Sequence, residues 1–264
     1  MPLKAEWLRV SAAGDLSLWA YGVLVALVLA ALHLGAPLAL AVCTLSFWHY
    51  ALYWLAYRYR AVPLRIFRRD AVVMKSVSLL ALGAVYFVTP LDLWSLTTVG
   101  AGFLLNIAAA RALGPDRTYY GYELARLPRR RITAFPYSHF AHPMLAGNVV
   151  AFGGTLLNAG FRADWWPLAC AHIALNAGLM VMETNPLQRR RSAAGSGPLA
   201  GGALVISGAG LGAATAYPGE VAAIIAAAAI GGCCCAYAWV LARCYAAPTP
   251  ALDAGQNMQT EGSS

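Results

Sequence analysis

Charged side chains are scarce in this sequence. Asp, Glu, Lys and Arg make up only 11% of its 264 residues, whereas hydrophobic residues make up 60%. A soluble domain carries about 25% charged residues, because its surface faces water. The composition therefore excludes an ordinary soluble globular domain and predicts helices that lie in lipid.

Acidic residues are the scarcer of the two signs, with 11 Asp and Glu against 19 Lys and Arg, so the formal net charge is +8. No folded basic module surrounds the basic clusters, and we therefore exclude a nucleic-acid partner. Basic residues beside a membrane span interact with anionic lipid headgroups, at about 1 kcal/mol each. Lipid contact accounts for the positive charge.

Cysteines at metal-ligand spacing are also lacking among the six present. Cys233, Cys234 and Cys235 are consecutive, so on a helix they point in three directions and cannot converge on one ion. We expect no metal site. The first apolar run lacks a small-residue cleavage site, which predicts a retained span and not a removed signal peptide.

Long apolar runs are what the sequence has in abundance. A spanning helix needs about 20 mostly apolar residues. Such runs occur at 16–34, 36–57, 71–90, 94–112, 139–160, 164–182, 198–217 and 221–243. The sequence therefore predicts an all-α fold, a polytopic membrane bundle of about eight transmembrane helices.

Alternating spans bring the basic residues to one face of the membrane. This face carries Lys4, Arg9, Arg58, Arg60, Arg65, Arg68, Arg69, Arg111, Arg117, Arg126, Arg129 to Arg131, Arg189 to Arg191 and Arg243. Arg162 alone falls opposite, beside Asp92, Asp164 and Glu220. Because Lys and Arg accumulate on the cytoplasmic side, the basic face and both termini are predicted to be cytosolic.

Polar chemistry concentrates between Val99 and Pro143. Gly100 and Gly102 leave a bare patch on a helix, which permits either close helix packing or close approach of a ligand to the backbone. A group of tyrosines follows: Tyr119, Tyr120, Tyr122 and Tyr137. Such rings either anchor a protein at the membrane interface or hold a cation by cation–π attraction, and both readings stay open.

His142 and Glu183 are the other candidates in this region. His142 precedes Pro143, where its imidazole either caps a helix or serves a ligand. Glu183 ends a span close to Arg189 to Arg191, so it either forms a surface ion pair or belongs to a site. The predicted threading puts both residues on the side of Tyr119 to Tyr122. Convergence of this kind is what an active site requires.

Three stretches resemble a known family. TYYGYELARLPRRRITAFPYSHFAHPMLAGN, from Thr118, is similar to a central motif of the membrane-embedded phosphatidylethanolamine N-methyltransferases, within the wider isoprenylcysteine methyltransferase-like superfamily. VGAGFLLNIAAARALG, from Val99, resembles their Gly-x-Gly helix, and ALYWLAYRYR, from Ala51, their early aromatic span. The segment METNP retains only one acid of the family's Glu-Glu-Pro, and Leu145 replaces a usual Tyr.

The resemblance implies a site for S-adenosyl-L-methionine as methyl donor. It implies cofactor contacts at Gly100, Gly102, Glu183 and Thr184. His142, Glu183 or a tyrosinate-like Tyr119 would accept the proton of the substrate ammonium. Tyr137 is predicted to contact the substrate, and Arg129, Arg130 and Arg131 either clamp a lipid phosphate or only anchor the chain.

The implied reaction is N-methylation of phosphatidylethanolamine and its mono- and dimethyl forms towards phosphatidylcholine, with the later steps favoured. The partner would be a phospholipid in the bilayer, and the family implies the endoplasmic reticulum membrane. Two alternatives remain: methylation of a prenylcysteine carboxylate or other lipid, and a non-catalytic scaffold or transporter. The predicted domains are an extra span at 1–35, the methyltransferase-like core at 36–192, a helix pair at 193–246 and a disordered tail at 247–264.

Overall fold

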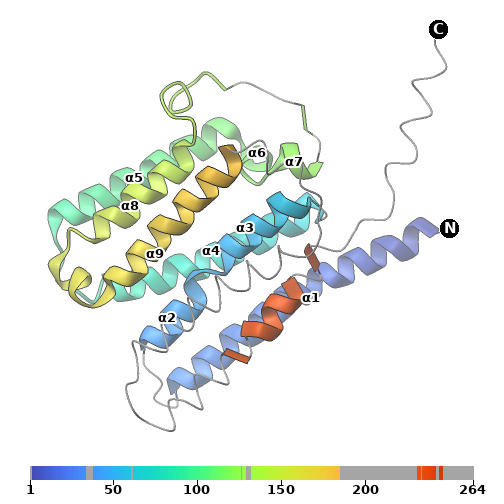
Figure 1. The fold of residues 1–264 in the computed structure, drawn as a ribbon, viewed down its shortest axis with the longest axis horizontal. Coiled ribbons are helices and arrows are strands. Elements are labelled where there is room, and N and C mark those ends of the chain that lie inside the picture. The colour runs from blue at the N-terminus through green and yellow to red at the C-terminus, as the bar shows by residue number, and fades with distance from the viewer. Residues whose placement is uncertain are drawn as a thin grey trace.

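The computed structural model describes residues 2–33, 38–60, 62–125, 127–128, 132–184, 231–232, 234–241 and 244–245, and these form helices joined by turns and loops. The helices are α1 (Pro2–His33), α2 (Leu38–Ser46), α3 (Trp48–Tyr59), α4 (Leu64–Tyr86), α5 (Leu93–Leu113), α6 (Pro115–Thr118), α7 (Gly121–Ala125), α8 (Pro143–Thr155) and α9 (Ala159–Thr184) (Figure 1). The all-α prediction is confirmed for this part of the chain.

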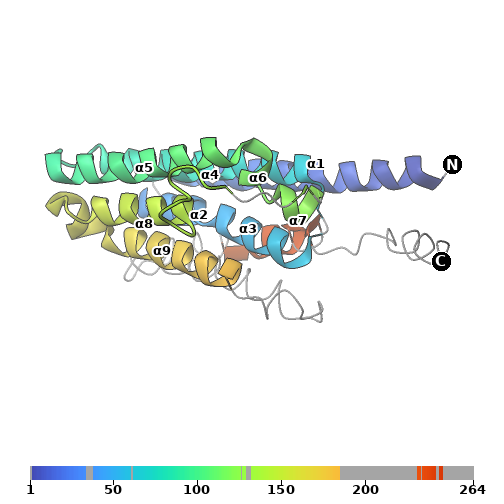
Figure 2. The same ribbon diagram turned by 90° about the horizontal axis from the view of Figure 1, so that it is seen from above.

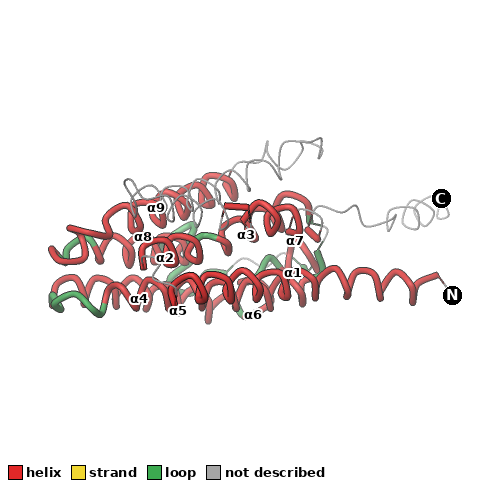
Figure 3. Tube along the Cα trace, turned by 90° about the horizontal axis from the view of Figure 1, so that it is seen from below, coloured by secondary structure: helices red, strands yellow, loops and turns green. Residues whose placement is uncertain are grey.

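The long helices form two layers. Helices α1, α4 and α5 lie in one layer, and α2, α3, α8 and α9 lie in the other (Figures 2 and 3). Helix α8 packs against both α5 and α9, and α4 packs against α2 and α3. The short α6 and α7 lie at one end of the bundle (Figure 1), where α6 is in the layer of α5 and α7 is in the layer of α8 (Figure 2).

Local sequence sets the ends of α5, α6 and α8. The Asp92 carboxylate accepts a hydrogen bond from the Ser95 N–H at 2.7 Å and caps the start of α5. Gly114, at φ 84°, ends α5 in a conformation that a side chain would disfavour, and Pro115 starts α6. Pro143 occupies the first turn of α8 and leaves His142 at the N-cap.

Four described segments are long and apolar enough to cross a membrane: Leu16–His33, Leu38–Tyr59, Leu93–Leu113 and Ala159–Thr184. They make this chain an integral membrane protein. The predicted spans 71–90 and 139–160 fall on α4 and α8, and the predicted span 36–57 is divided at Phe47. The run 198–217 lies outside the described residues and 221–243 is described only in part, so the count of eight is not confirmed.

Helices α5 and α8 approach each other backbone to backbone through small residues. A Cβ added at Gly102 would lie 2.5 Å from the Gly147 carbonyl oxygen and would also collide with the Ala151 N–H. The Ser95 hydroxyl donates to the Gly154 carbonyl at 2.7 Å in the same interface. Gly147, Ala151 and Gly154 thus form the small-residue stripe typical of tightly packed membrane helices.

The chain outside the predicted methyltransferase-like core shares its hydrophobic core. Tyr237 packs its ring against Tyr21 of α1 and Trp48 of α3, at centroid distances of 5.7 and 4.5 Å. The Tyr245 hydroxyl donates to Asp70 of α4 at 2.9 Å. These contacts join α1 and the described C-terminal residues to the central helices, and the division into four segments stays a prediction.

Candidate active site at one end of the bundle

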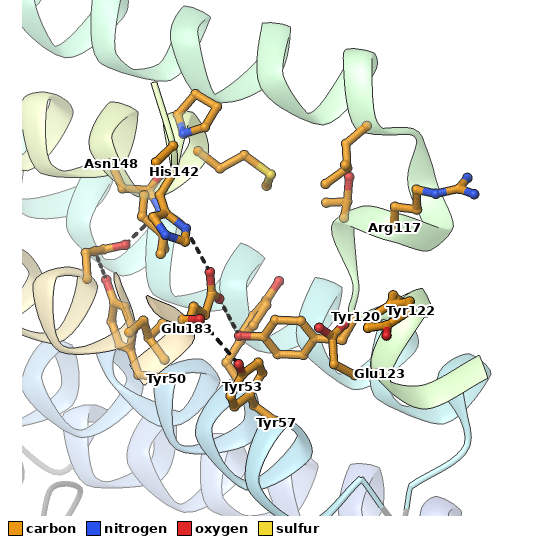
Figure 4. Close-up of a pocket in the computed structure, with 18 of the residues that line it drawn as sticks. Tyr50, Tyr53, Tyr57, Arg117, Tyr120, Tyr122, Glu123, His142, Asn148 and Glu183 are labelled. Atoms are coloured by element: carbon orange, nitrogen blue, oxygen red, sulfur yellow. Dashed lines mark hydrogen bonds and ion pairs between the residues drawn. The ribbon is translucent and has the colours of Figure 1, made fainter. Parts of the chain in front are cut away.

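A cavity of about 640 Å³ opens at the end of the bundle where α3, α6, α7, α8 and α9 meet (Figure 4). Its volume lies within the range of small-molecule sites. The lining residues are His49, Tyr50, Tyr53, Tyr57, Lys75, Leu113, Arg117, Thr118, Tyr120, Tyr122, Glu123, Pro128, Tyr137, Ala141, His142, Pro143, Met144, Leu145, Asn148, Asn176, Leu179 and Glu183. Three of the predicted site residues, His142, Glu183 and Tyr137, are therefore brought together.

Glu183 is the centre of a contact network in this cavity. The Tyr120 hydroxyl donates to Glu183 Oε1 at 2.7 Å, and His142 Nδ1 lies 3.2 Å from Oε2 (Figure 4). The side chains of His142 and Glu183 are 21% and 22% exposed. A carboxylate that is half-buried and has both oxygens engaged keeps a fixed orientation.

Three separate elements bring these residues together. Glu183 lies in the last turn of α9, His142 is the N-cap of α8, and Tyr120 lies in the turn between α6 and α7. Tyr120 adopts φ 58°, which is uncommon for a residue with a side chain. The turn directs the phenol inward, where its ring stacks on Phe67 at a centroid distance of 5.6 Å.

An aromatic wall from α3 lies beside Glu183. Tyr50, Tyr53 and Tyr57 line the cavity, and their spacing of three and four residues puts them on one face of the helix. The rings of Tyr53 and Tyr57 lie 5.6 and 5.3 Å from that of Tyr120. The sequence prediction did not include this wall, although tyrosines recurring at helical spacing within an apolar run are a signal for it.

Two tyrosines at the loop side of the cavity, Tyr120 and Tyr137, stay protonated. Burial, followed by the charge of Glu183 and the hydrogen bond to it, raises the pKa of Tyr120 well above its ordinary value. Burial and then Glu183 raise the pKa of Tyr137 to about 12. Both phenols are therefore neutral hydrogen-bond donors near neutral pH.

Tyr119, predicted as a tyrosinate-like proton acceptor, lies elsewhere. It is not among the cavity-lining residues, and its ring packs at 6.3 Å from that of Phe67. Burial raises the pKa of Tyr119, although the Arg68 guanidinium opposes this shift. A raised pKa disfavours the phenolate. Of these two adjacent tyrosines, Tyr120 is the one that contacts the Glu183 carboxylate.

The Gly-x-Gly pair also lies away from the cavity. Gly102 is buried against α8, whereas a Cβ added at Gly100 would meet nothing within 4 Å. Gly100 is 13 residues, or about 20 Å along the helix, from the cavity-lining Leu113. The Thr184 hydroxyl donates to the Met180 carbonyl at 2.8 Å on an exposed turn. Arg129, Arg130 and Arg131 lie outside the described residues.

A chain of buried polar side chains forms the inner end of the cavity. Asn106 donates to Asn148 at 2.8 Å, Asn148 to Asn176 at 2.9 Å, and Asn176 to the Tyr50 hydroxyl at 2.8 Å. Tyr50 in turn contacts His172 Nδ1 at 2.8 Å. The network links α5, α8, α9 and α3, and it fixes which atom each amide presents. Sequence reasoning missed it, because no local pattern pairs residues so far apart.

The basic residues of the described chain gather at this same end. Arg58 lies in the last turn of α3 and Arg60 at its C-cap, Arg65 and Arg68 lie near the start of α4, and Arg117 lines the cavity. Arg162 lies at the start of α9, at the opposite end. The predicted separation of basic residues is therefore seen in the described helices, and the cavity belongs to the basic end.

Comparison with protein families supplies independent information on this site. Residues 91–190 match the family model described as phospholipid methyltransferase. Comparisons with curated proteins and with solved structures give no match. The matched segment contains α5, α8 and α9 and supplies Tyr120, His142 and Glu183 to the cavity. Residues 91–190 of this membrane protein are thus similar to the phospholipid methyltransferase family.

Proposed function

We propose that this protein transfers methyl groups from S-adenosyl-L-methionine to the headgroup nitrogen of phosphatidylethanolamine and its mono- and dimethyl forms, with the later steps favoured. The observation that carries the proposal is the Glu183 carboxylate beside tyrosine rings in a cavity at the basic end of a membrane bundle. Carboxylates and aromatic faces bind cations. The donor sulfonium and the lipid ammonium are both cations.

The residues present fit the methyl donor. S-adenosyl-L-methionine supplies a methyl group on a positively charged sulfur, which is a strong electrophile. Glu183 would hold this cation, and the rings of Tyr53 and Tyr57 line the same cavity. Tyr120 donates to Glu183 and keeps the carboxylate turned into the cavity. Contacts at Gly100, Gly102 and Thr184, implied by the family resemblance, remain predictions.

His142 would accept the proton that the substrate ammonium must lose before methylation. Its Nδ1 lies 3.2 Å from Glu183 Oε2, and a proton held on Nδ1 in this contact would leave the lone pair on Nε2. The carboxylate also stabilises the imidazolium that forms after proton uptake. Glu183 and His142 together therefore provide cation binding and a general base.

The lipid would reach this cavity from the bilayer and the methyl donor from the cytosol. We assign the basic end to the cytosolic side, in the endoplasmic reticulum membrane, with both termini on that side. Tyr137 lines the cavity and donates from a neutral phenol, which suits contact with a headgroup oxygen. Arg129, Arg130 and Arg131 precede this loop and would attract lipid phosphate or anchor the chain.

His142→Ala should lower kcat about 100-fold and leave the affinity for S-adenosylhomocysteine within a few-fold, because the variant loses the proton acceptor and keeps the carboxylate. The measurement combines turnover of phosphatidyl-N-methylethanolamine with equilibrium binding of the product. His139→Ala is the matched control, since His139 is exposed in the same loop. Undiminished turnover in His142→Ala would remove His142 from the proton transfer.

The reaction itself is tested with membranes that contain this chain and methyl-labelled S-adenosyl-L-methionine. Each of the three ethanolamine-series lipids is supplied in turn and the labelled lipids are separated. We expect label in the methylated lipids of this series, and we expect the most label when the mono- or dimethyl substrate is supplied. Label only in a prenylcysteine ester would identify the alternative substrate. Absence of label together with absence of S-adenosylhomocysteine binding would favour a scaffold or transporter.

A further inference from the structure

Lys75 lines the cavity as a cation without a counterion among the described residues. It is one of two lysines in the sequence and lies four residues inside the apolar run 71–90, about 6 Å along α4. It lines the cavity, and its ammonium forms no hydrogen bond or ion pair with any described residue. An ionisable group in a membrane span is costly, and it is usually retained for function.

His49 presents a second unpartnered polar group beside Lys75. Its ring is 6% exposed and lines the cavity, and its Nδ1 is buried without a hydrogen-bond partner among the described residues. Lys75 lies close enough to His49 for the two side chains to interact electrostatically. A buried polar atom without a partner is unfavourable unless a ligand or water satisfies it.

Among the described residues that line the cavity, no carboxylate pairs with Lys75. Glu123 and Glu183 are the only acidic residues among those that line the cavity. Glu183 already contacts Tyr120 and His142, and Glu123 lies on α7 at the loop side. The neighbours Asn148 and Asn176 are neutral. The cavity therefore has a negative group near its mouth and a positive group farther in.

This order of charges matches a phospholipid that enters from the bilayer. In a lipid, the amine faces the cytosol, the phosphate lies deeper and the acyl chains lie deepest. Asn148 is six residues beyond His142 and Asn176 seven residues before Glu183, so the inner end is about 10 Å deeper than these two residues. The four-carbon stem of Lys75 lets its ammonium extend towards the mouth.

We propose that Lys75 and His49 form a subsite for the phosphate group of the phospholipid substrate, which sets the depth at which the headgroup nitrogen meets Glu183 and His142. The inference rests on the proposed function for the identity of the lipid. A charge-assisted hydrogen bond from a lysine to phosphate contributes roughly tenfold or more to binding. The subsite would select a phosphodiester over a neutral lipid amine.

The test measures equilibrium binding, so its outcome does not depend on catalysis. Purified protein in detergent is titrated with short-chain phosphatidyl-N-methylethanolamine and with an alkyl ether of N-methylethanolamine, which has the amine and lacks the phosphate. We expect Lys75→Met to weaken phospholipid binding at least tenfold and to leave ether binding unchanged. Lys75→Arg should restore most of the phospholipid affinity, and Lys4→Met, at the only other lysine, should have no effect.

Three results would overturn the inference. Equal weakening of both ligands by Lys75→Met would indicate a packing role. A loss of S-adenosylhomocysteine affinity in place of lipid affinity would mean that Lys75 binds the donor carboxylate. Inorganic phosphate that binds as tightly as the phospholipid would assign the subsite to a free anion. A wild-type protein that binds the lipid through Lys75 and transfers no methyl group would contradict the proposed function alone.

Discussion

Replacing Glu183 by Gln should lower kcat/KM for the phospholipid about 100-fold or more, the largest loss expected from any single isosteric change in the cavity. Gln keeps the volume and one acceptor oxygen, but it removes the negative charge. That charge faces a cationic donor and a cationic substrate in the proposed reaction, and it stabilises protonated His142. Three favourable interactions are weakened by one substitution.

The binding affinities of two ligands distinguish the effect of the charge of Glu183 from the effect of its shape. Glu183→Gln should weaken binding of sinefungin, which carries an ammonium in place of the sulfonium, more than binding of neutral S-adenosylhomocysteine. Asp164→Asn is the matched control, because it removes an exposed carboxylate at the opposite end of the bundle. Equal weakening of both ligands would show that Glu183 does not contact the positive centre. Full activity in the variant would remove it from the site.

The pairing of Glu183 with His142 is the part of the site that sequence reasoning reached. Alternating spans put both residues at one end, and the structure brings His142 Nδ1 to 3.2 Å from the carboxylate. Helix position is sufficient for such a prediction, since apolar run length fixes where each helix ends. Both residues lie at a helix terminus, one before α8 and one at the end of α9.

The choice between Tyr119 and Tyr120 was beyond the sequence. The two are adjacent, and the positive φ of Tyr120 in the turn between α6 and α7 decides which phenol points inward. Turn conformations of this kind depend on the surrounding packing, here the stacking of Tyr120 on Phe67. The residues of α3 and α4 were missed for another reason. Tyr50, Tyr53 and Lys75 lie before the segment with the strongest family resemblance.

The second large expected effect concerns the Gly-x-Gly pair and the stability of the fold. Gly102→Leu should abolish most of the folded protein, because even a Cβ there would lie 2.5 Å from the Gly147 carbonyl oxygen and collide with the Ala151 N–H. Backbone atoms cannot move aside as a flexible side chain would, so α5 and α8 must separate. Thermal melting in detergent, followed by size-exclusion chromatography, measures the loss.

Gly100→Leu is the matched control for this change, since it adds the same side chain two residues away, where a Cβ meets nothing within 4 Å. The melting temperature of Gly100→Leu should equal that of the wild type. If Gly102→Leu had the same melting temperature as Gly100→Leu, the packing role of Gly102 would be refuted. The affinity of Gly100→Leu for S-adenosylhomocysteine tests the cofactor contact implied by the family resemblance. Lost affinity in a fully folded variant would support that contact, whereas unchanged affinity would restrict the pair to helix packing.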